Sequence, residues 1–280
     1  MVDIKYTQNL YINEENLKRI IDAIKLHSSD TVIDIGAGKG VITEELAKHC
    51  DDVIAYELDS KYHGMLEGLF KDNPNVLLKN EDFLPSTLPN KEYKVFANIP
   101  FSLTSDIINK ITDVDSKLVE AYLFVQKESA ERYIGRPKNT QISAILSSIY
   151  DLNVTETFDR RDFNPTPNVD IVLLSITKKN NPEIEFKLYR DYITYIFNQM
   201  NGSVLDTFKK LFTFDQLKYI KKYLSEHGYI KPTDISSEYY LEIFQYFEMN
   251  GVDYRKRVDG YYTKHINQHL RRDKVNRTRI

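Results

Sequence analysis

The chain has 280 residues and a formal net charge of −3, and its composition already excludes several classes of protein. Cys50 is the only cysteine, so neither a disulfide framework nor a cysteine-based zinc site can form within the chain. No stretch approaches the roughly 18 apolar residues of a membrane span, and the first residues lack a basic run followed by an apolar run. These features predict a soluble cytoplasmic protein without membrane contact, built from one large domain and a smaller second one.

The charge is unevenly distributed along the chain. Residues 251–280 contain nine Lys or Arg against three Asp, a net charge of +6, whereas residues 1–250 sum to −9. A basic end of this kind is typical of an arm that binds nucleic acid, although a solvated terminus without function has the same composition. The sequence alone predicts no fold for residues 251–280.

The first 180 residues alternate between short β-rich runs and segments of helical periodicity, a pattern typical of a parallel sheet wrapped by helices. The expected strands are residues 31–35, 53–56, 76–78, 94–97 and 121–125, and the expected helices are residues 43–49, 60–70, 104–111 and 141–150. Residues 152–158 and 171–177 are expected to close the sheet as an antiparallel pair. The pattern predicts an α/β fold, a doubly wound Rossmann-like sheet with helices on both faces.

The composition changes at residues 178–182, which contain a proline and no apolar residue and form the best candidate domain boundary. Aromatic and aliphatic residues then recur at helical spacing between residues 187 and 248, which predicts three or four short helices without strands. The expected organisation is a sheet domain at residues 1–180, a small all-helical C-terminal domain at 181–250, and a basic extension at 251–280.

The first expected strand runs into a glycine-rich turn, Gly36-Ala37-Gly38-Lys39-Gly40, and a helical segment comes next. Glycine permits a tight turn and lets backbone N–H groups approach a ligand closely. The turn reads G-x-G-x-G instead of the dinucleotide pattern G-x-G-x-x-G, which favours S-adenosylmethionine over NAD as the cofactor. A lone turn of this kind is more often structural, so the interpretation depends on the residues at the ends of the next strands.

Polar and aromatic residues stand at the ends of the second and third expected strands. Glu57 comes about 20 residues after the first glycine of the turn, where its carboxylate can accept hydrogen bonds from both ribose hydroxyls. Asp82 can accept from an adenine amino group, and Phe83 can pack on the face of its ring. Taken singly, Glu57 could be a solvated strand end and Phe83 a core residue. Their order after successive strands predicts a site for a nucleoside-containing cofactor.

Asn98-Ile99-Pro100-Phe101 follows the fourth expected strand and predicts a pocket for a planar base that carries an amino group. The exocyclic amine of a nucleobase is a poor nucleophile because its lone pair is delocalised into the ring. The Asn98 side chain and the Ile99 carbonyl, whose position Pro100 restricts, could accept its two hydrogens. Phe101 could stack on the base.

In this order, the residues resemble the Erm family of ribosomal RNA adenine-N6 methyltransferases, which is related to the small-subunit rRNA dimethyladenosine transferases. The resemblance runs from residue 8 to about residue 247. Residues 211–217 and 241–247 look like Erm helices. The seven markers are Gln8-Asn9-Leu10, Ile35-Gly36-Ala37-Gly38-Lys39-Gly40, Glu57-Leu58-Asp59, Glu81-Asp82-Phe83-Leu84, Asn98-Ile99-Pro100-Phe101, Val125-Gln126-Lys127-Glu128 and Phe163-Asn164-Pro165-Thr166-Pro167-Asn168-Val169.

The resemblance implies a class I methyltransferase fold and a monomer that methylates the N6 amine of one adenine in 23S rRNA, either free or in an early precursor. The modification would confer resistance to macrolides, lincosamides and streptogramin B. The amine would attack the sulfonium methyl group of S-adenosylmethionine directly, without a metal or a covalent enzyme intermediate, so positioning would do most of the catalysis.

The resemblance also implies that residues 1–180 are the S-adenosylmethionine-dependent methyltransferase domain and that the small helical domain at 181–250 binds RNA. It implies further site residues as well. Gln8, Asn9, Leu10, Leu58 and Asn98 would contact the cofactor. A second aromatic at the base pocket would be Phe163, for which a buried loop anchor is an equally good interpretation. The residues implied to touch RNA phosphates are Lys127, Arg132, Arg136, Lys138, Arg160 and Arg161, although a solvated charged helix would also explain the first four.

Three other functions stay open. One is the 16S dimethyladenosine activity of the related family, and another is methylation of a different rRNA nucleotide. The third is a non-catalytic RNA-binding assembly or transcription factor. The chain departs from the Erm pattern at Ile171, where the family commonly has serine, in its acidic body, and in residues 251–280, which extend beyond the compact family length.

Overall fold

The computed structural model describes residues 9–180, 184–199, 202–251 and 254–268. The described chain divides into two compact units. The sheet unit contains residues up to 130 and residues 151–178, and the helical unit contains residues 131–150 and the residues from 179 onward. The helical unit therefore includes an internal segment as well as the C-terminal part of the chain. The residue-level division into 1–180, 181–250 and 251–280 stays a prediction.

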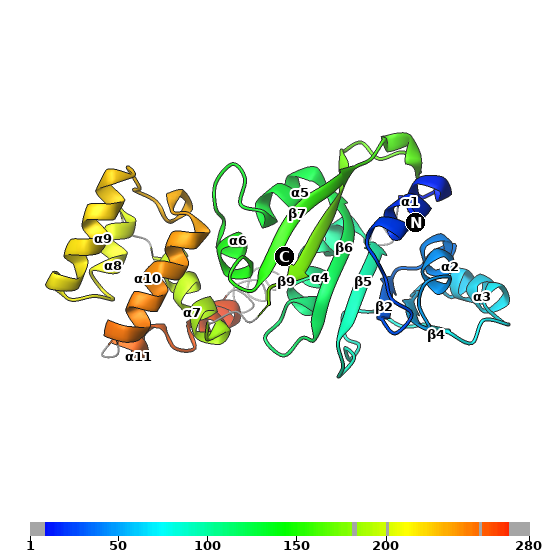
Figure 1. Cartoon of the computed structure of the whole chain (residues 1–280), viewed down its shortest axis with the longest axis horizontal. Coiled ribbons are helices and arrows are strands. Elements are labelled where there is room, and N and C mark those ends of the chain that lie inside the picture. The colour runs from blue at the N-terminus through cyan, green and yellow to red at the C-terminus, as the bar shows by residue number, and fades with distance from the viewer. Residues whose placement is uncertain (1–8, 181–183, 200–201, 252–253, 269–280) are drawn as a thin grey trace, which may run out of the picture. The chain divides into compact units, whose positions relative to one another are not determined.

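A seven-stranded sheet forms the centre of the sheet unit, in the order β4-β3-β2-β5-β6-β9-β7 (Figure 1). Strands β2 to β6 are parallel, and β9 is antiparallel to β6. Every residue of β2 is buried, as expected where helices cover both faces of a parallel sheet. The predicted α/β fold class is confirmed. The strands are β2 Thr31–Ile35, β3 Asp52–Tyr56, β4 Val76–Lys79, β5 Tyr93–Asn98, β6 Leu118–Gln126, β7 Tyr150–Thr157 and β9 Ile171–Lys178.

The crossover helices follow the predicted periodicity. In α4 the isoleucines at 107, 108 and 111 are fully buried, which fastens this helix to the sheet through one apolar face. Figure 1 shows α2 and α3 beside the β3–β4 edge of the sheet. The crossover helices are α2 Val41–Ala47, α3 Ser60–Leu69 and α4 Thr104–Ile111. Helix α5 Lys127–Tyr133, which follows β6, was not among the expected helices.

One predicted helix is shorter than expected. The helix predicted at 141–150 ends early, as α6 Gln141–Leu146, and strand β7 begins at Tyr150. Thr140 caps its first turn, whereas the hydroxyls of Ser147 and Ser148 bond back to backbone carbonyls three residues earlier. Such local side-chain bonds compete with continued helix and favour a turn.

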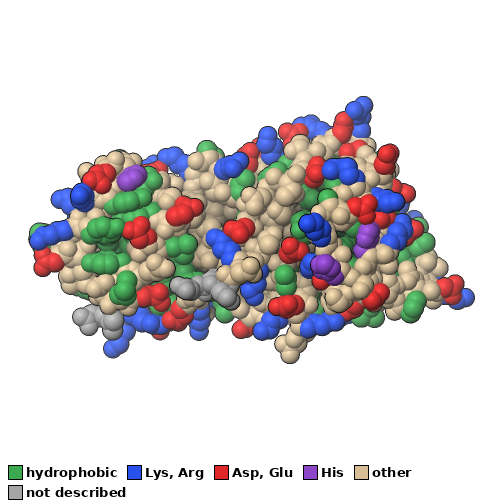
Figure 2. Space-filling view, in the orientation of Figure 1, with side chains coloured by type: hydrophobic (Ala, Val, Ile, Leu, Met, Phe, Trp, Pro, Cys, Tyr) green, Lys and Arg blue, Asp and Glu red, His purple; other side chains and the backbone are tan. Residues whose placement is uncertain are grey.

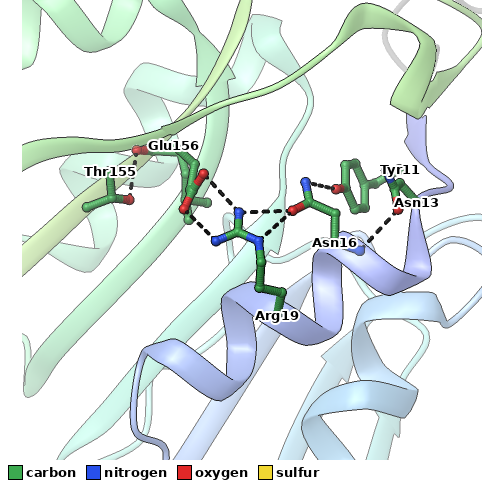
Figure 3. A network of polar contacts seen from close by, with 7 residues as sticks. Tyr11, Asn13, Asn16, Arg19, Thr155 and Glu156 are labelled. Carbon is green, nitrogen blue, oxygen red and sulfur yellow. Dashed lines mark hydrogen bonds and ion pairs between the residues drawn. The ribbon is translucent and has the colours of Figure 1, made fainter.

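The N-terminal segment contains two elements that periodicity did not predict, strand β1 Leu10–Tyr11 and helix α1 Glu14–Ala23. Strand β1 pairs antiparallel with β8 Phe163–Asn164. Figure 3 shows how α1 is tied to its surroundings. The Asn16 amide donates to the Tyr11 hydroxyl at 2.9 Å, and the Arg19 guanidinium pairs with Glu156 of β7 at 3.0 Å. These bonds hold the start of the described chain against the sheet.

The helical unit has an aromatic core. Tyr189 and Tyr192 of one helix pack against Phe244 with ring centroids 5.1 and 5.3 Å apart. The prediction of three or four short helices between 187 and 248 is confirmed by four α-helices among the described residues of that stretch. They are α7 Phe186–Phe197, α8 Val204–Phe208, α9 Phe214–Glu226 and α10 Ser237–Asn250.

Residues 255–268, for which the sequence predicted no fold, are also mostly helical. They contain the short helix α11 Arg255–Val258 and a helical stretch at residues 261–268. Throughout the described parts of the chain, every helix is too short or too polar to cross a membrane.

Candidate active site

A pocket opens at the carboxyl ends of β2, β3, β4 and β5, on the edge of the sheet where parallel strands deliver their loops. The chain reverses its direction of winding between β2 and β5, because β3 and β4 lie on one side of β2 and β5 and β6 on the other. Ligands of such sheets bind at this switch point. The predicted site residues that line the pocket are Gly36, Glu57, Leu58, Asp82, Phe83 and Pro100.

The glycine turn forms the β2 side of the pocket. Gly36 and Gly38 have φ angles of 76° and 56°, a region that side chains other than glycine rarely adopt. The N–H groups of Gly36 and Ala37 both donate to the Tyr56 carbonyl, at 2.8 and 3.0 Å, so the turn is bonded to the end of β3. The turn therefore needs its glycines for the backbone path itself.

Glu57 connects this turn to the rest of the pocket. Its two carboxylate oxygens accept from the N–H groups of Gly38 at 2.7 Å and Asp59 at 2.8 Å, and only 7% of the residue is exposed. A carboxylate offers about four acceptor positions, so two remain for hydroxyl groups of a ligand. Glu57 is therefore a preoriented acceptor at the edge of the pocket and is not a solvated strand end.

The opposite end of the pocket combines a carboxylate with aromatic rings. Asp82 is exposed and accepts from the Leu84 N–H at 2.9 Å, which folds the loop after β4. Phe83 is 4% exposed and meets the Tyr56 ring edge-to-face, with centroids 5.1 Å apart. Both rings line the pocket, which suits the flat face of a purine.

Lys110 of α4 is hydrogen-bonded to the loop that follows β4. Its Nζ donates to the carbonyls of Phe83 at 2.7 Å and Leu84 at 2.9 Å, and also to the Ser86 carbonyl. The same ammonium lies 4.7 Å from the centre of the Phe83 ring. Partial burial lowers the pKa of Lys110. Periodicity and motifs did not identify this lysine.

Asn98 ends β5 beside the N-terminal segment. Its Nδ2 donates to the Asn9 carbonyl at 2.7 Å, so two residues 89 positions apart are bonded. This bond leaves Oδ1 as the acceptor of the amide. Asn98 and Ile99 are 8% and 2% exposed, whereas Phe101 is partly buried against the aromatic core of the sheet unit. The structure thus brings Asn9 to the Asn98-Ile99-Pro100-Phe101 motif.

Some predicted residues lie elsewhere. Phe163 is 2% exposed among Tyr11, Phe124 and Phe158, which is the position of a buried anchor, and its contact with a base stays a prediction. A side chain on Gly40 would meet Leu66 of α3 at 2.8 Å, so this glycine is required for helix packing. Gln8 lies outside the described residues, and Leu10 pairs with Asn164.

A buried acid that the sequence motifs did not single out lies beneath the turn. Asp34, the residue before Ile35, is 1% exposed, and one carboxylate oxygen accepts from the Thr43 hydroxyl at 2.7 Å. The other oxygen has no partner among the described residues. Burial raises the pKa of Asp34 to about 7, and the nearby Glu57 adds to the effect. The sequence signal that could have identified Asp34 is its position as an acid two residues before the glycine-rich turn.

Other lining residues were also missed. Leu103 and Ile107 follow the Asn98 motif at a spacing of four, so the start of α4 presents one face to the pocket. The sequence placed Ile107 in the helix expected at 104–111 but indicated no contact with a ligand. Tyr56 and Tyr62 also line the pocket and were not identified from the sequence. The remaining lining residues belong to the family markers but were assigned no contact, and they are Ile35, Asp59, Glu81 and Leu84.

The predicted RNA contacts differ in how strongly they are already paired. Arg160 and Arg161 each bind a carboxylate at 2.6 Å, Asp170 and Asp159 respectively. The Arg161 guanidinium lowers the pKa of Asp159 to about 2. In the helical unit, Lys138 pairs with Asp234 at 2.6 Å. The predicted contacts that are exposed and form no ion pair with an acid among the described residues are Lys127, Arg132 and Arg136.

Residues 2–249 match the family model described as ribosomal RNA adenine dimethylase. The chain belongs to this family. The chain is 30% identical over 252 residues to an rRNA adenine N-6-methyltransferase of Lysinibacillus sphaericus, covering 89% of the chain and 99% of that protein. It is 33% identical over 199 residues to a ribosomal RNA small subunit methyltransferase A of Thermotoga neapolitana, covering 70% of the chain and 75% of that protein.

Solved structures share the fold of this chain. The 23S rRNA methyltransferase ErmE aligns with a TM-score of 0.77 at 21% identity, covering 86% of the chain and 100% of that structure. A dimethyladenosine transferase from Plasmodium falciparum aligns with a TM-score of 0.69 at 22% identity, covering 86% and 98%. The resemblance predicted from the sequence is confirmed.

The chain is accordingly an S-adenosylmethionine-dependent methyltransferase. The chemistry of the pocket fits this cofactor. One cavity is lined by a carboxylate for hydroxyl groups, by a second carboxylate and two aromatic rings for a purine, and by Gly36, the first residue of the glycine turn. The bound cofactor supplies an electrophilic methyl group, and the protein residues hold and orient the two reactants.

Proposed function

We propose that this enzyme methylates the N6 amine of an adenine in 23S rRNA and thereby confers resistance to macrolides, lincosamides and streptogramin B. It would act as a monomer in the cytoplasm, on RNA that is free or in an early precursor. The C-terminal resemblance supports the 23S assignment. Of the two stretches that look like Erm helices, residues 211–217 contain the start of α9 and residues 241–247 lie within α10. Relatives named for the small subunit make 16S rRNA the second candidate.

The observation that carries this proposal is the orientation of Asn98. With Nδ2 bound to the Asn9 carbonyl, Oδ1 is left to accept a hydrogen from an amine. The Ile99 carbonyl, held next to Pro100, would accept the second hydrogen. Two acceptors would polarise the N–H bonds and raise the electron density on the nitrogen. The nitrogen would bond to the methyl carbon as the methyl–sulfur bond breaks, and the positively charged amine would then release one proton to solvent. Phe101 would stack on the base and keep the amine in line.

The cofactor would lie along the carboxyl ends of the strands. We assign the ribose hydroxyls to Glu57, and the adenine to Asp82 and the Phe83 ring. The methionine end would lie near the glycine turn and Asn98, whose side chain is bonded to the Asn9 carbonyl. The full set of proposed cofactor contacts is Gln8, Asn9, Leu10, Gly36, Ala37, Gly38, Gly40, Glu57, Leu58, Asp82, Phe83 and Asn98.

For RNA phosphates we propose two groups of contacts. Lys127, Arg132 and Arg136 are exposed and would bind phosphates without losing an acidic partner that the structure shows. Arg160 and Arg161 would exchange Asp170 and Asp159 for phosphate, and Lys138 would similarly exchange Asp234. These contacts would supply affinity that falls with salt and carry little sequence information.

The deciding experiment incubates the enzyme with labelled S-adenosylmethionine and naked 23S or 16S rRNA, then maps the modified nucleotide by primer extension. We expect label at one adenine of 23S rRNA. Label in 16S rRNA alone would reject the 23S assignment, and label in neither RNA would reject the activity on naked rRNA.

Asn98→Ala tests the assigned mechanism in the same assay. We expect methyl transfer to fall below detection while RNA affinity stays within about twofold of wild type, because the amide acts on the reacting amine. Asn90→Ala is the matched control, since Asn90 is an exposed asparagine in the same unit. Undiminished transfer by Asn98→Ala would refute the role of the amide.

A further inference from the structure

The chain continues beyond the part that the family model matches, which ends at residue 249. Residues 254–268 are described and form helix α11 and the helical stretch at 261–268. We call residues 254–268 the C-terminal segment. It belongs to the helical unit and packs on α7.

A buried carboxylate fastens the C-terminal segment to α7. Asp191 is 2% exposed, and its two oxygens accept from the N–H groups of Gly260 and Tyr262, each at 2.8 Å. These N–H groups begin the helical stretch at 261–268, where four such donors lack partners within the helix. A negative charge is also favourable at a helix N-terminus. Asp191 therefore acts as a helix cap supplied from another helix.

Side-chain contacts extend this attachment on both sides. The Tyr261 ring meets Tyr195 edge-to-face at 5.1 Å, and the Arg190 guanidinium lies 4.1 Å from the centre of the Tyr262 ring. Arg255 pairs with Glu185 at 2.7 Å. A segment with a buried cap, packed rings and an ion pair has a defined place on the helical unit.

The exposed side of the C-terminal segment is basic. Lys256, Arg257 and Lys264 are exposed, against Asp259 as its only described acid. Lys256 and Lys264 have no acidic partner among the described residues. The sequence adds five more Lys or Arg and one Asp after residue 268. On the face shown in Figure 2, by comparison, basic and acidic side chains are interspersed.

We propose that the C-terminal segment is an RNA-phosphate-binding element added to the family fold, held in place by Asp191. The proposal rests on RNA being the substrate. Its lysines would neutralise phosphates of the RNA backbone, which gives affinity without sequence preference. The charges of a helix that is already packed have set positions before RNA binds. Binding therefore costs less conformational entropy than it would for a disordered arm.

The first test replaces the two lysines that have no acidic partner in the described part of the chain, as Lys256→Ala with Lys264→Ala. It measures affinity for in vitro transcribed 23S rRNA over a range of salt concentrations. We expect weaker binding and a slope of log affinity against log salt that is shallower by about 1 per lysine. The matched control is Lys71→Ala with Lys117→Ala, which removes the same charge from exposed positions of the sheet unit that likewise form no ion pair among the described residues. We expect the control to retain most of the wild-type slope.

The outcomes separate a local site from a general effect of charge. Equal loss in both double variants would overturn the proposal, because it would show that only net charge matters. An unchanged slope in the Lys256 and Lys264 variant would overturn it as well. Methylation at saturating RNA should stay unchanged in both variants. Absence of methylation in the wild type would count against the proposed activity, while the binding comparison would still test the C-terminal segment.

Asp191→Asn tests the attachment. The amide can accept from only one of the two N–H groups, so the helical stretch should loosen. We expect trypsin to cleave after Arg255, Lys256, Arg257 or Lys264 faster than in the wild type, and RNA affinity to fall severalfold. Wild-type protection together with wild-type affinity would refute the role of Asp191. The two surface lysine variants keep the proposal testable if Asp191→Asn fails to fold.

Discussion

Lys110→Met removes the ammonium that holds the adenine end of the pocket but retains a side chain of similar length. In the wild type, Lys110 Nζ donates hydrogen bonds to the backbone carbonyls of residues 83, 84 and 86. A hydrogen bond to a charged group contributes about 1.5–3 kcal/mol when shielded from water. Lys110 is only half-buried, so in the variant water can replace part of these hydrogen bonds. We therefore take the loss of cofactor-binding free energy as about 1.4 kcal/mol in total. This value corresponds to roughly a tenfold change in affinity.

The assay is calorimetric titration with S-adenosylhomocysteine, followed by kinetics at varied S-adenosylmethionine. We expect the Kd and the KM for the cofactor to rise about tenfold, with kcat at saturation within about twofold of wild type, because the loop binds the cofactor and does not touch the amine. A general loss of folding would lower kcat and the Tm as well.

Lys91→Met is the matched control, because Lys91 forms an exposed ion pair with Asp52 at 2.6 Å. It should leave cofactor affinity unchanged. The reasoning would be refuted if Lys110→Met bound S-adenosylhomocysteine within twofold of wild type while circular dichroism showed an intact fold.

Three further variants test buried or pocket groups. Tyr192→Phe removes a buried hydroxyl that has no partner among the described residues, and it should raise the free energy of unfolding by about 1 kcal/mol in urea denaturation; a loss of 1 kcal/mol would contradict this. Burial raises the pKa of Asp34 from 3.8 to about 7, so wild-type stability should fall between about pH 4 and 7, where the unfolded chain has already ionised, and then level off. Asp34→Asn should lack this fall, which amounts to at most about 4 kcal/mol, and parallel curves for the two proteins would refute the assignment. Glu57→Gln should weaken S-adenosylhomocysteine binding more than tenfold, because an NH₂ group would face one of the backbone N–H groups that now bond to the carboxylate; unchanged affinity would remove Glu57 from the site.

Much of the sheet unit could be predicted from the sequence because its signals are local. Alternating apolar runs and helical periods identified the strands and crossover helices within a few residues. Parallel strands joined by such crossovers end at one edge of the sheet. Glu57, Asp82 and Pro100 therefore meet at one pocket once their strands are assigned.

Other features depended on contacts between distant parts of the chain. The bond from Asn98 to the Asn9 carbonyl joins residues in different elements and sets which amide oxygen is left as an acceptor. Lys110 reads as an ordinary helix-surface lysine until its ammonium is found beneath the loop after β4. Phe163 had two equal interpretations, and its burial among three other rings came from packing.

The C-terminal segment shows most clearly which features follow from the local sequence and which depend on contacts between distant residues. Its sequence determined the net charge, because charge is a sum over residues and needs no fold. Its attachment depended on Asp191, about 70 residues earlier, whose apolar neighbours in α7 suggested only a buried helix. Periodicity reports which face of an element is buried, whereas the partner that satisfies a buried charge is chosen by tertiary packing. The sequence by itself therefore determined the sheet, the strand-end motifs and the charge, and the tertiary structure decided which groups those motifs and charges meet.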